Sequence, residues 1–68
     1  MKICLKDIKI ALKNIETQRP ENERVYIRIF VDGSGTIVSQ EIDSDFEPTE
    51  MYEFETSEQL SNIICAYL

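Results

Sequence analysis

The clearest pattern in the chain is an alternation of apolar with polar or aromatic positions over residues 24–31, and a second alternating run follows over residues 36–43. A two-residue period is typical of a strand that buries one face. Between the runs, residues 32–35 read Asp-Gly-Ser-Gly, a composition that tolerates the positive φ angles of a tight turn. The two runs therefore predict a β-hairpin, around which the rest of the chain is organised.

The same pattern predicts the register of the hairpin. With Gly33 and Ser34 as the two central turn residues, the buried face pairs mostly apolar side chains across the strands. These pairs are Val31/Thr36, Ile29/Val38, Ile27/Gln40 and Val25/Ile42. The outer face then pairs Phe30/Ile37, Arg28/Ser39, Tyr26/Glu41 and Arg24/Asp43. A three-residue loop is rejected because it would set Val25 opposite Glu41 and bury a carboxylate.

Residues 3–17 have the period of a helix, with apolar side chains three or four positions apart. This stripe consists of Leu5, Ile8, Leu12 and Ile15, with Ala11 beside it. The opposite side of the predicted helix carries Lys2, Lys6, Lys9 and Lys13. We interpret these lysines as a solvated face, and a basic docking helix is the alternative.

After a polar loop, alternation returns from Met51 to Glu55 and predicts a third strand, with Tyr52 and Phe54 inward. The period then changes to that of a helix. The first residues of this helix carry a Thr-x-x-Gln spacing, typical of a capping box in which each side chain bonds the backbone N–H of the other residue. The predicted helix continues to the last residue.

These elements predict an α+β fold of two layers. A three-stranded antiparallel meander lies between an N-terminal and a C-terminal helix in the order α-β-β-β-α, and both helices pack on one face of the sheet. We expect residues 1–68 to form a single domain. No apolar run approaches the roughly 20 residues of a membrane span, and the lysines near the start are unlike a signal peptide. We expect a soluble, cytoplasmic protein.

Cys4 and Cys65 lie near opposite ends of the chain, each within a predicted helix. The chain has no CxxC pair and no histidine with which a metal site could be completed. We predict two buried, reduced thiols, because cysteine packs as a small hydrophobe. A disulfide between the two residues is the alternative, which a reducing cytosol disfavours.

Charge is distributed unevenly along the sequence. All seven basic residues lie at or before Arg28, where four acidic residues leave a net charge of +3. Residues 29–68 contain nine acidic residues and no basic one, so the chain as a whole carries −6. Such an acidic segment repels the phosphates of nucleic acid and favours a basic protein surface as partner.

The face of the sheet opposite the helices is predicted to be open, and we expect it to bind that partner together with the acidic loop after the hairpin. Aromatic and large apolar anchors within a charged rim are typical of interfaces. The candidate partner-binding residues are Tyr26, Arg28, Phe30, Ile37, Glu41, Asp43, Asp45, Glu47, Met51, Glu53 and Glu55. An ordinary solvated sheet face is the alternative interpretation.

Four of these residues, Glu41, Asp43, Asp45 and Glu47, recur at every second position. On extended backbone they would project to one side about 6.5 to 7 Å apart, which is of the order of the separation between successive phosphates. Our hypothesis is that this acidic ridge mimics a nucleic-acid backbone and occupies a basic channel on the partner. A solubilising charged loop is the alternative.

The junction over residues 54–60, Phe-Glu-Thr-Ser-Glu-Gln-Leu after an antiparallel meander, resembles the corresponding junction in small phage-encoded anti-CRISPR proteins that inhibit type I surveillance complexes. The resemblance implies a compact protein that binds a Cas subunit in the host cytoplasm and blocks target DNA, with aromatic and acidic side chains at the interface. The chain departs from that pattern by a helix before the sheet and by the lack of a second helix after the junction. No site residue is carried over.

The sequence carries no catalytic signature. There is no histidine, no GxSxG and no phosphate-binding loop, and the glycines at 33 and 35 lie at a hairpin tip. We therefore predict a non-enzymatic inhibitor that needs no cofactor or metal. The alternative is a small structural or regulatory homodimer that uses the open sheet face or an edge strand. Salt distinguishes the two, because acidic docking weakens as ionic strength rises and apolar pairing does not.

Overall fold

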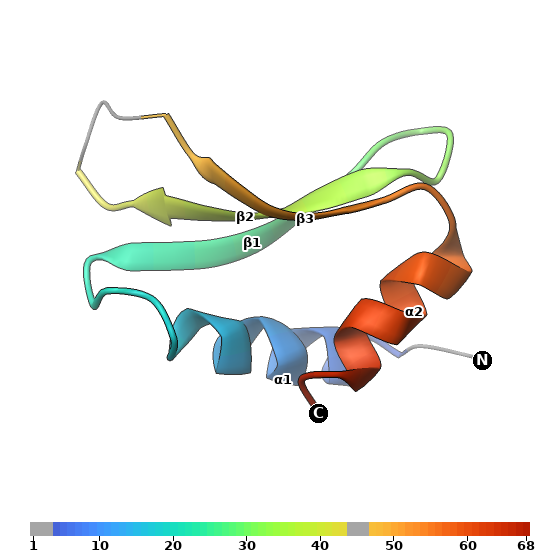
Figure 1. The fold of residues 1–68 in the computed structure, drawn as a ribbon, viewed down its shortest axis with the longest axis horizontal. Helices are drawn as coiled ribbons and strands as arrows, with labels where there is room; N and C mark the ends of the chain where they lie inside the picture. Colours follow the sequence, from blue (N-terminus) through green and yellow to red (C-terminus); the bar gives the residue numbers. More distant parts are fainter. Residues whose placement is uncertain (1–3, 44–46) are drawn as a thin grey trace.

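The chain folds into a three-stranded sheet with both helices on the same side of it, as Figure 1 shows. The computed structural model describes residues 4–43 and 47–68. The elements are α1 (Leu5–Glu16), β1 (Glu23–Ile29), β2 (Gly35–Glu41), β3 (Thr49–Phe54) and α2 (Ser57–Cys65). The strand order is β1-β2-β3 with antiparallel neighbours, so β1 and β3 are the two edges. The predicted α-β-β-β-α order is confirmed.

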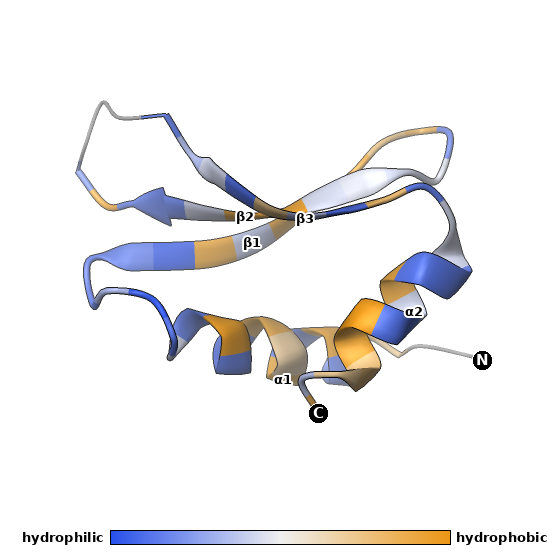
Figure 2. Cartoon of the chain, viewed as in Figure 1, coloured by the Kyte–Doolittle hydropathy of each residue, from blue (hydrophilic) through white to orange (hydrophobic). Residues whose placement is uncertain are grey.

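The hydrophobic core lies between the sheet and the helices, where Figure 2 shows hydrophobic residues in the middle of the strands and on both helices. Its buried members are Ala11, Ile15, Ile37, Phe54, Leu60 and Ile64. In α1 the predicted apolar stripe is fully buried only toward the end of the helix. Leu5, in the first turn, is 80% exposed. The described lysines of α1 are exposed, as predicted.

The start of α2 is fixed by the predicted cap. The Thr56 hydroxyl accepts a hydrogen bond from the backbone N–H of Gln59 at 3.2 Å. The Gln59 side chain reaches back to accept from the N–H of Glu55 at 2.6 Å, one residue before the position that a capping box uses. Two donors that the helix itself cannot satisfy are thereby paired.

The predicted register of the hairpin is wrong. Phe30 and Ser34 close the turn, the N–H of Phe30 donating to the Ser34 carbonyl at 2.8 Å, so three residues form the loop. Gly33 has a φ of 92°. The Asp32 carboxylate accepts from the Ser34 hydroxyl at 2.6 Å and from its backbone N–H at 3.0 Å, and these bonds hold the pKa of Asp32 below its ordinary value. A side chain that satisfies the turn backbone in this way stabilises the three-residue loop.

This turn displaces β2 by three residues relative to the predicted register. Val38, predicted opposite Ile29, lies opposite Tyr26, and Ile37 lies opposite Ile27. Because a strand has a two-residue period, an odd displacement reverses both of its faces. Ile37 and Ser39 therefore point to the helices, and Thr36, Val38 and Gln40 take the open face. Ile37, predicted to contact a partner, is a core residue.

The pairing of β2 with β3 contains an irregularity. Ile37 lies opposite Tyr52, but the next residue, Val38, lies opposite Glu50, so Met51 has no partner of its own. Such a bulge turns a side chain out of the regular alternation. Met51, predicted to be on the open face, is half-buried and packs against the core.

The cysteines are placed differently from the prediction. No disulfide joins Cys4 and Cys65, but both are exposed, so the prediction of burial is wrong.

After α2, the hydroxyl of Tyr67 is hydrogen-bonded to that of Tyr52 in β3. This hydrogen bond, together with burial, raises the pKa of Tyr67.

Neither α1 nor α2, the two described helices, is long and apolar enough to cross a membrane.

Candidate functional site

The topology gathers the acidic half of the sequence at one edge of the molecule. β3 is an edge strand and α2 packs on it, whereas α1 packs on β1 at the other edge. Five exposed glutamates precede, occupy and follow β3 and begin α2, and we call them the acidic edge. They are Glu47, Glu50, Glu53, Glu55 and Glu58.

No cation of the described chain neutralises this acidic edge. Within residues 4–43 and 47–68, one ion pair is closer than 4 Å, and it joins Arg19 to Glu23 at 2.8 Å. Arg19 lies in the connection between α1 and β1, on the basic side of the sheet. The carboxylates of the acidic edge therefore present their charge to solvent, and like charges gathered on one surface attract a partner of opposite sign.

The predicted acidic ridge does not form as an extended run. Asp43 has a φ of 58°, in the left-handed region, so the backbone turns where the ridge requires it to stay extended. The carboxylate of Glu41 is occupied by the Asn22 side-chain amide at 2.6 Å. Asp45 lies outside the described residues. The ridge geometry is thus wrong between Glu41 and Asp43, and the exposed carboxylate of Glu47 belongs to the acidic edge instead.

On the open face, Tyr26 and Arg28 form a connected pair. The Arg28 guanidinium lies 5.7 Å from the centre of the Tyr26 ring and donates to its hydroxyl at 3.2 Å. That hydroxyl in turn donates to the Gln40 side-chain oxygen at 3.0 Å. Val38, between Tyr26 and Glu50 in the register, is fully buried although no helix covers this face. Tyr26, Arg28 and Gln40 are therefore held together on the open face by their own contacts.

Where the open face meets the hairpin turn, the surface forms a hollow of about 220 Å³, which we call the hairpin hollow. It is lined by Phe30, Ser34, Gly35, Thr36, Glu53, Phe54 and Glu55. Phe30 is 53% exposed, and the Thr36 hydroxyl is buried without a hydrogen-bond partner in the described structure. Two carboxylates of the acidic edge thus meet an aromatic ring and an unpaired hydroxyl.

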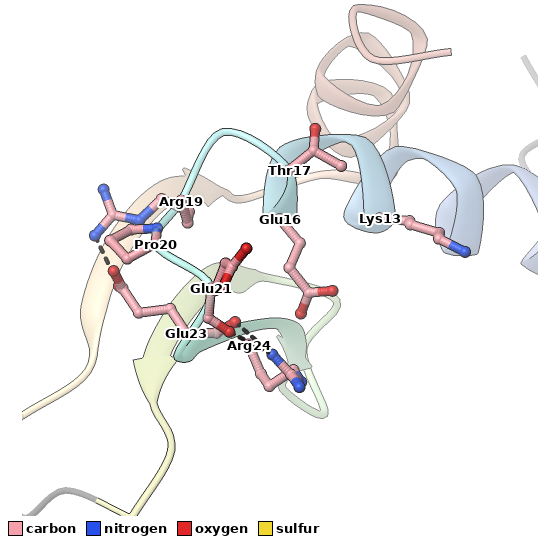
Figure 3. A pocket seen from close by; sticks show the side chains of 8 residues that line it. All are labelled: Lys13, Glu16, Thr17, Arg19, Pro20, Glu21, Glu23 and Arg24. Carbon is pink, nitrogen blue, oxygen red and sulfur yellow. Dashed lines mark hydrogen bonds and ion pairs between the residues drawn. The ribbon is translucent and has the colours of Figure 1, made fainter.

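A larger hollow, about 390 Å³, lies between the end of α1 and the start of β1 (Figure 3). Its polar groups serve the fold. The Glu16 carboxylate accepts from the Val25 N–H at 3.0 Å, and Arg19 bonds Glu23, which also accepts from a buried serine hydroxyl of β2 at 3.0 Å. Lys13 extends away from these groups in Figure 3. We conclude that the polar groups of this hollow hold α1 and the loop after it against the sheet.

Glu23 makes part of the stability dependent on pH. The hydrogen bond from Arg19, with that from Ser39 and the charge of Arg19, holds the pKa of Glu23 below its ordinary value of 4.5, although burial acts in the opposite direction. On acidification, the Glu23 carboxylate is therefore protonated at a higher pH in the unfolded chain than in the folded one. The contribution of Glu23 to stability is complete above pH 4.5 and is lost as the pH falls through the lower pKa of the folded state.

We expect Glu23→Gln to lower the free energy of unfolding at neutral pH, and the difference from the parent protein to shrink on acidification to about pH 3. Urea titrations at the two pH values measure it. The control is Glu21→Gln, an exposed residue of the loop that precedes β1. A difference for Glu23→Gln that is equal at both pH values would contradict the assignment.

The structure thus redistributes the predicted partner-binding residues. Those that remain exposed are Arg28, Phe30, Asp43, Glu47, Glu53 and Glu55, and those that are half-buried are Tyr26, Glu41 and Met51. The residues that the prediction missed are Thr36, Val38 and Gln40, which take the open face of β2, and Glu50 and Glu58, which belong to the acidic edge. The Asp-x-Ser sequence of the turn, in which a side chain bonds the turn backbone, was the signal that could have placed Thr36, Val38 and Gln40 on the open face.

Within the part of the chain that the structure describes, no group of three cysteine or acidic side chains is arranged to hold a metal ion.

Comparison of the chain with protein-family models, with curated proteins and with solved structures finds no match in any of the three.

Proposed function

We propose that the protein is a non-enzymatic inhibitor that docks its acidic edge and the adjoining open face on a basic, nucleic-acid-binding surface of another protein. The observation that carries the proposal is the acidic edge itself, five exposed glutamates of which none forms an ion pair closer than 4 Å within the described residues. A surface of this kind accelerates the encounter with a basic partner and disfavours acidic ones.

Nucleic acid and the acidic edge would compete for the same basic groups on such a partner, because both present negative charge that displaces counterions. The exposed ring of Phe30 and the half-buried ring of Tyr26 supply the apolar contacts that acidic docking alone lacks. Phe30 at the turn and Tyr26 beside Arg28 are residues of the types that dominate binding energy at interface centres.

The resemblance of residues 54–60 to anti-CRISPR inhibitors of type I surveillance complexes supports a Cas subunit as the partner. In the structure this junction ends β3, begins α2 and carries Glu55 and Glu58 of the acidic edge. On this proposal the protein acts in the cytoplasm of a host cell.

The proposal is tested by capture from a host lysate on the immobilised protein at low salt, after nuclease treatment, with mass spectrometry of the retained proteins. We expect a nucleic-acid-binding protein that is released by about 0.5 M salt and displaced by added nucleic acid, because both weaken charge pairing. Retention that neither salt nor nucleic acid changes would contradict the proposal.

A second candidate function, self-association, is favoured by the free edge of β1. The carbonyl of residue 22 accepts from the N–H of residue 42, and the N–H of residue 30 donates to the carbonyl of residue 34. Because hydrogen-bonded pairs alternate along an antiparallel ladder, Ile27 and Ile29 direct their N–H and C=O groups away from β2. The Ile29 side chain is 60% exposed, and Val31 beyond it is fully exposed. Unpaired backbone beside apolar side chains is a template for strand pairing. A dimer that sediments unchanged at about 0.5 M salt would support this candidate over acidic docking.

A further inference from the structure

The hairpin hollow contains a polar group that the fold leaves unpaired. Thr36 is 9% exposed, and its hydroxyl has no hydrogen-bond partner in the described structure. In the sheet it lies between Arg28 and Glu53, but the Arg28 guanidinium is bonded to Tyr26 instead. A buried hydroxyl without a partner costs free energy, so such a group calls for an explanation.

The other groups that line the hollow are acceptors and an aromatic ring. Glu53 and Glu55 are exposed and belong to the acidic edge, and Phe30 exposes half of its surface at the rim. At about 220 Å³ the hollow is smaller than the roughly 300 to 1,000 Å³ of sites for small-molecule ligands, and its size suits the end of one side chain. The two carboxylates are fewer than the oxygens that a hard metal ion requires.

We propose that the hairpin hollow binds the guanidinium group of an arginine from the protein partner. A guanidinium is planar and always charged, and its five N–H donors can serve both glutamates and the Thr36 hydroxyl while its face stacks on Phe30. An ammonium group lacks the flat face and the fork of donors. This inference rests on the proposed function, since the basic surface of the partner supplies the arginine.

A defined probe tests the site without the partner. The peptide acetyl-Gly-Arg-Gly-amide is titrated at low salt into the ¹⁵N-labelled protein, and amide chemical shifts are followed by NMR. We expect saturable shifts at residues 34–36 and 53–55. The same peptide with citrulline, which keeps the shape of arginine and loses its charge, should bind at least about tenfold more weakly because charge-assisted hydrogen bonds become neutral ones.

Thr36→Val tests whether the Thr36 hydroxyl takes part in binding or is merely left without a partner by the packing of the fold. Valine keeps the shape and removes the unpaired group, so the variant should be at least as stable as the parent and should bind the arginine peptide about fivefold more weakly. The control is Ser61→Ala in α2. It removes another buried hydroxyl that lacks a partner in the described structure, outside the hairpin hollow, and should leave peptide binding unchanged.

Three results overturn the inference. They are equal binding of the arginine and citrulline peptides, shifts spread along the acidic edge without a focus at the hollow, and unchanged binding by Thr36→Val. If any of these occurs while partner binding still depends on Glu47 and Glu50, which lie outside the hollow, the proposed function stands without the arginine site. Peptide binding as expected with no salt-sensitive partner would overturn the proposed function and support the arginine site alone.

Discussion

Gly35→Ala should unfold the domain or bring it close to unfolding. A Cβ atom on Gly35 would lie 2.0 Å from the carbonyl oxygen of Arg28 and 2.6 Å from the ring of Phe54. The carbonyl is backbone in the neighbouring strand and the ring is buried in the core, so neither can move cheaply. Overpacking of this kind costs about 3 kcal/mol, against a total stability of roughly 3 to 10 kcal/mol for a chain of this length. Thermal unfolding followed by circular dichroism measures the loss.

Gly33→Ala is the matched control, because it adds the same methyl group two residues earlier. Nothing lies within 4 Å of the Cβ position, so the cost is limited to the φ of 92°, about 1 to 2 kcal/mol. The order of the two losses tests the register of the hairpin. In the register predicted from the sequence, Gly33 is a central turn residue and Gly35 lies outside the turn, so a greater loss for Gly33→Ala would contradict the three-residue loop.

The double reversal Glu47→Lys/Glu50→Lys should strongly weaken binding to the partner at low salt. Both residues are exposed and belong to the acidic edge outside the hairpin hollow, so the arginine site keeps its glutamates. We expect the dissociation constant to rise by roughly 100-fold, since each like charge set against a basic surface costs on the order of 1 kcal/mol or more. Titration calorimetry with the captured partner, once purified, measures the change.

Asp7→Lys/Glu21→Lys is the control for net charge. It changes the charge of the chain by the same amount, but Asp7 lies in α1 and Glu21 in the connection to β1, on the basic side of the molecule. We expect this variant to bind nearly as well as the parent protein. Equal weakening by the two double variants would mean that net charge, and not the acidic edge, governs binding.

The fold was predictable because each element carries its own local signal. The 3.6-residue period before residue 17, the alternation before Phe54 and the cap at Thr56 each follow from a few neighbouring side chains. The observed bounds differ from the predicted ones by a few residues, as at the start of β3, which begins at Thr49. The order of the elements and their antiparallel arrangement needed nothing further.

The register was not predictable from hydrophobic pattern alone. Both faces of the hairpin are apolar enough to be buried, since Val38 and Ile37 are each fully buried on opposite faces of the same strand. The choice depends on the turn, where the Asp32 carboxylate bonds Ser34, and on the close approach of Gly35 to Phe54. The second of these contacts joins residues distant in sequence and becomes visible only in the folded chain.

The same error moved the candidate site. Because the faces of β2 were exchanged, the buried residue Ile37 was taken for a partner contact, and Thr36 at the hairpin hollow was taken for an inward residue. The charge of the second half of the chain was predictable from composition. Its concentration on one edge required the strand order, which places β3 at the edge of the sheet opposite to β1.

Displacement of nucleic acid from the partner tests the central claim most directly. The captured partner is bound to a fluorescently labelled nucleic acid, the protein is added at low salt, and fluorescence anisotropy reports the nucleic acid that remains bound. We predict complete displacement by the parent protein and by Asp7→Lys/Glu21→Lys, and none by Glu47→Lys/Glu50→Lys at the same concentration. A partner that holds the protein and the nucleic acid together would contradict the proposal that the acidic edge occupies a nucleic-acid-binding surface.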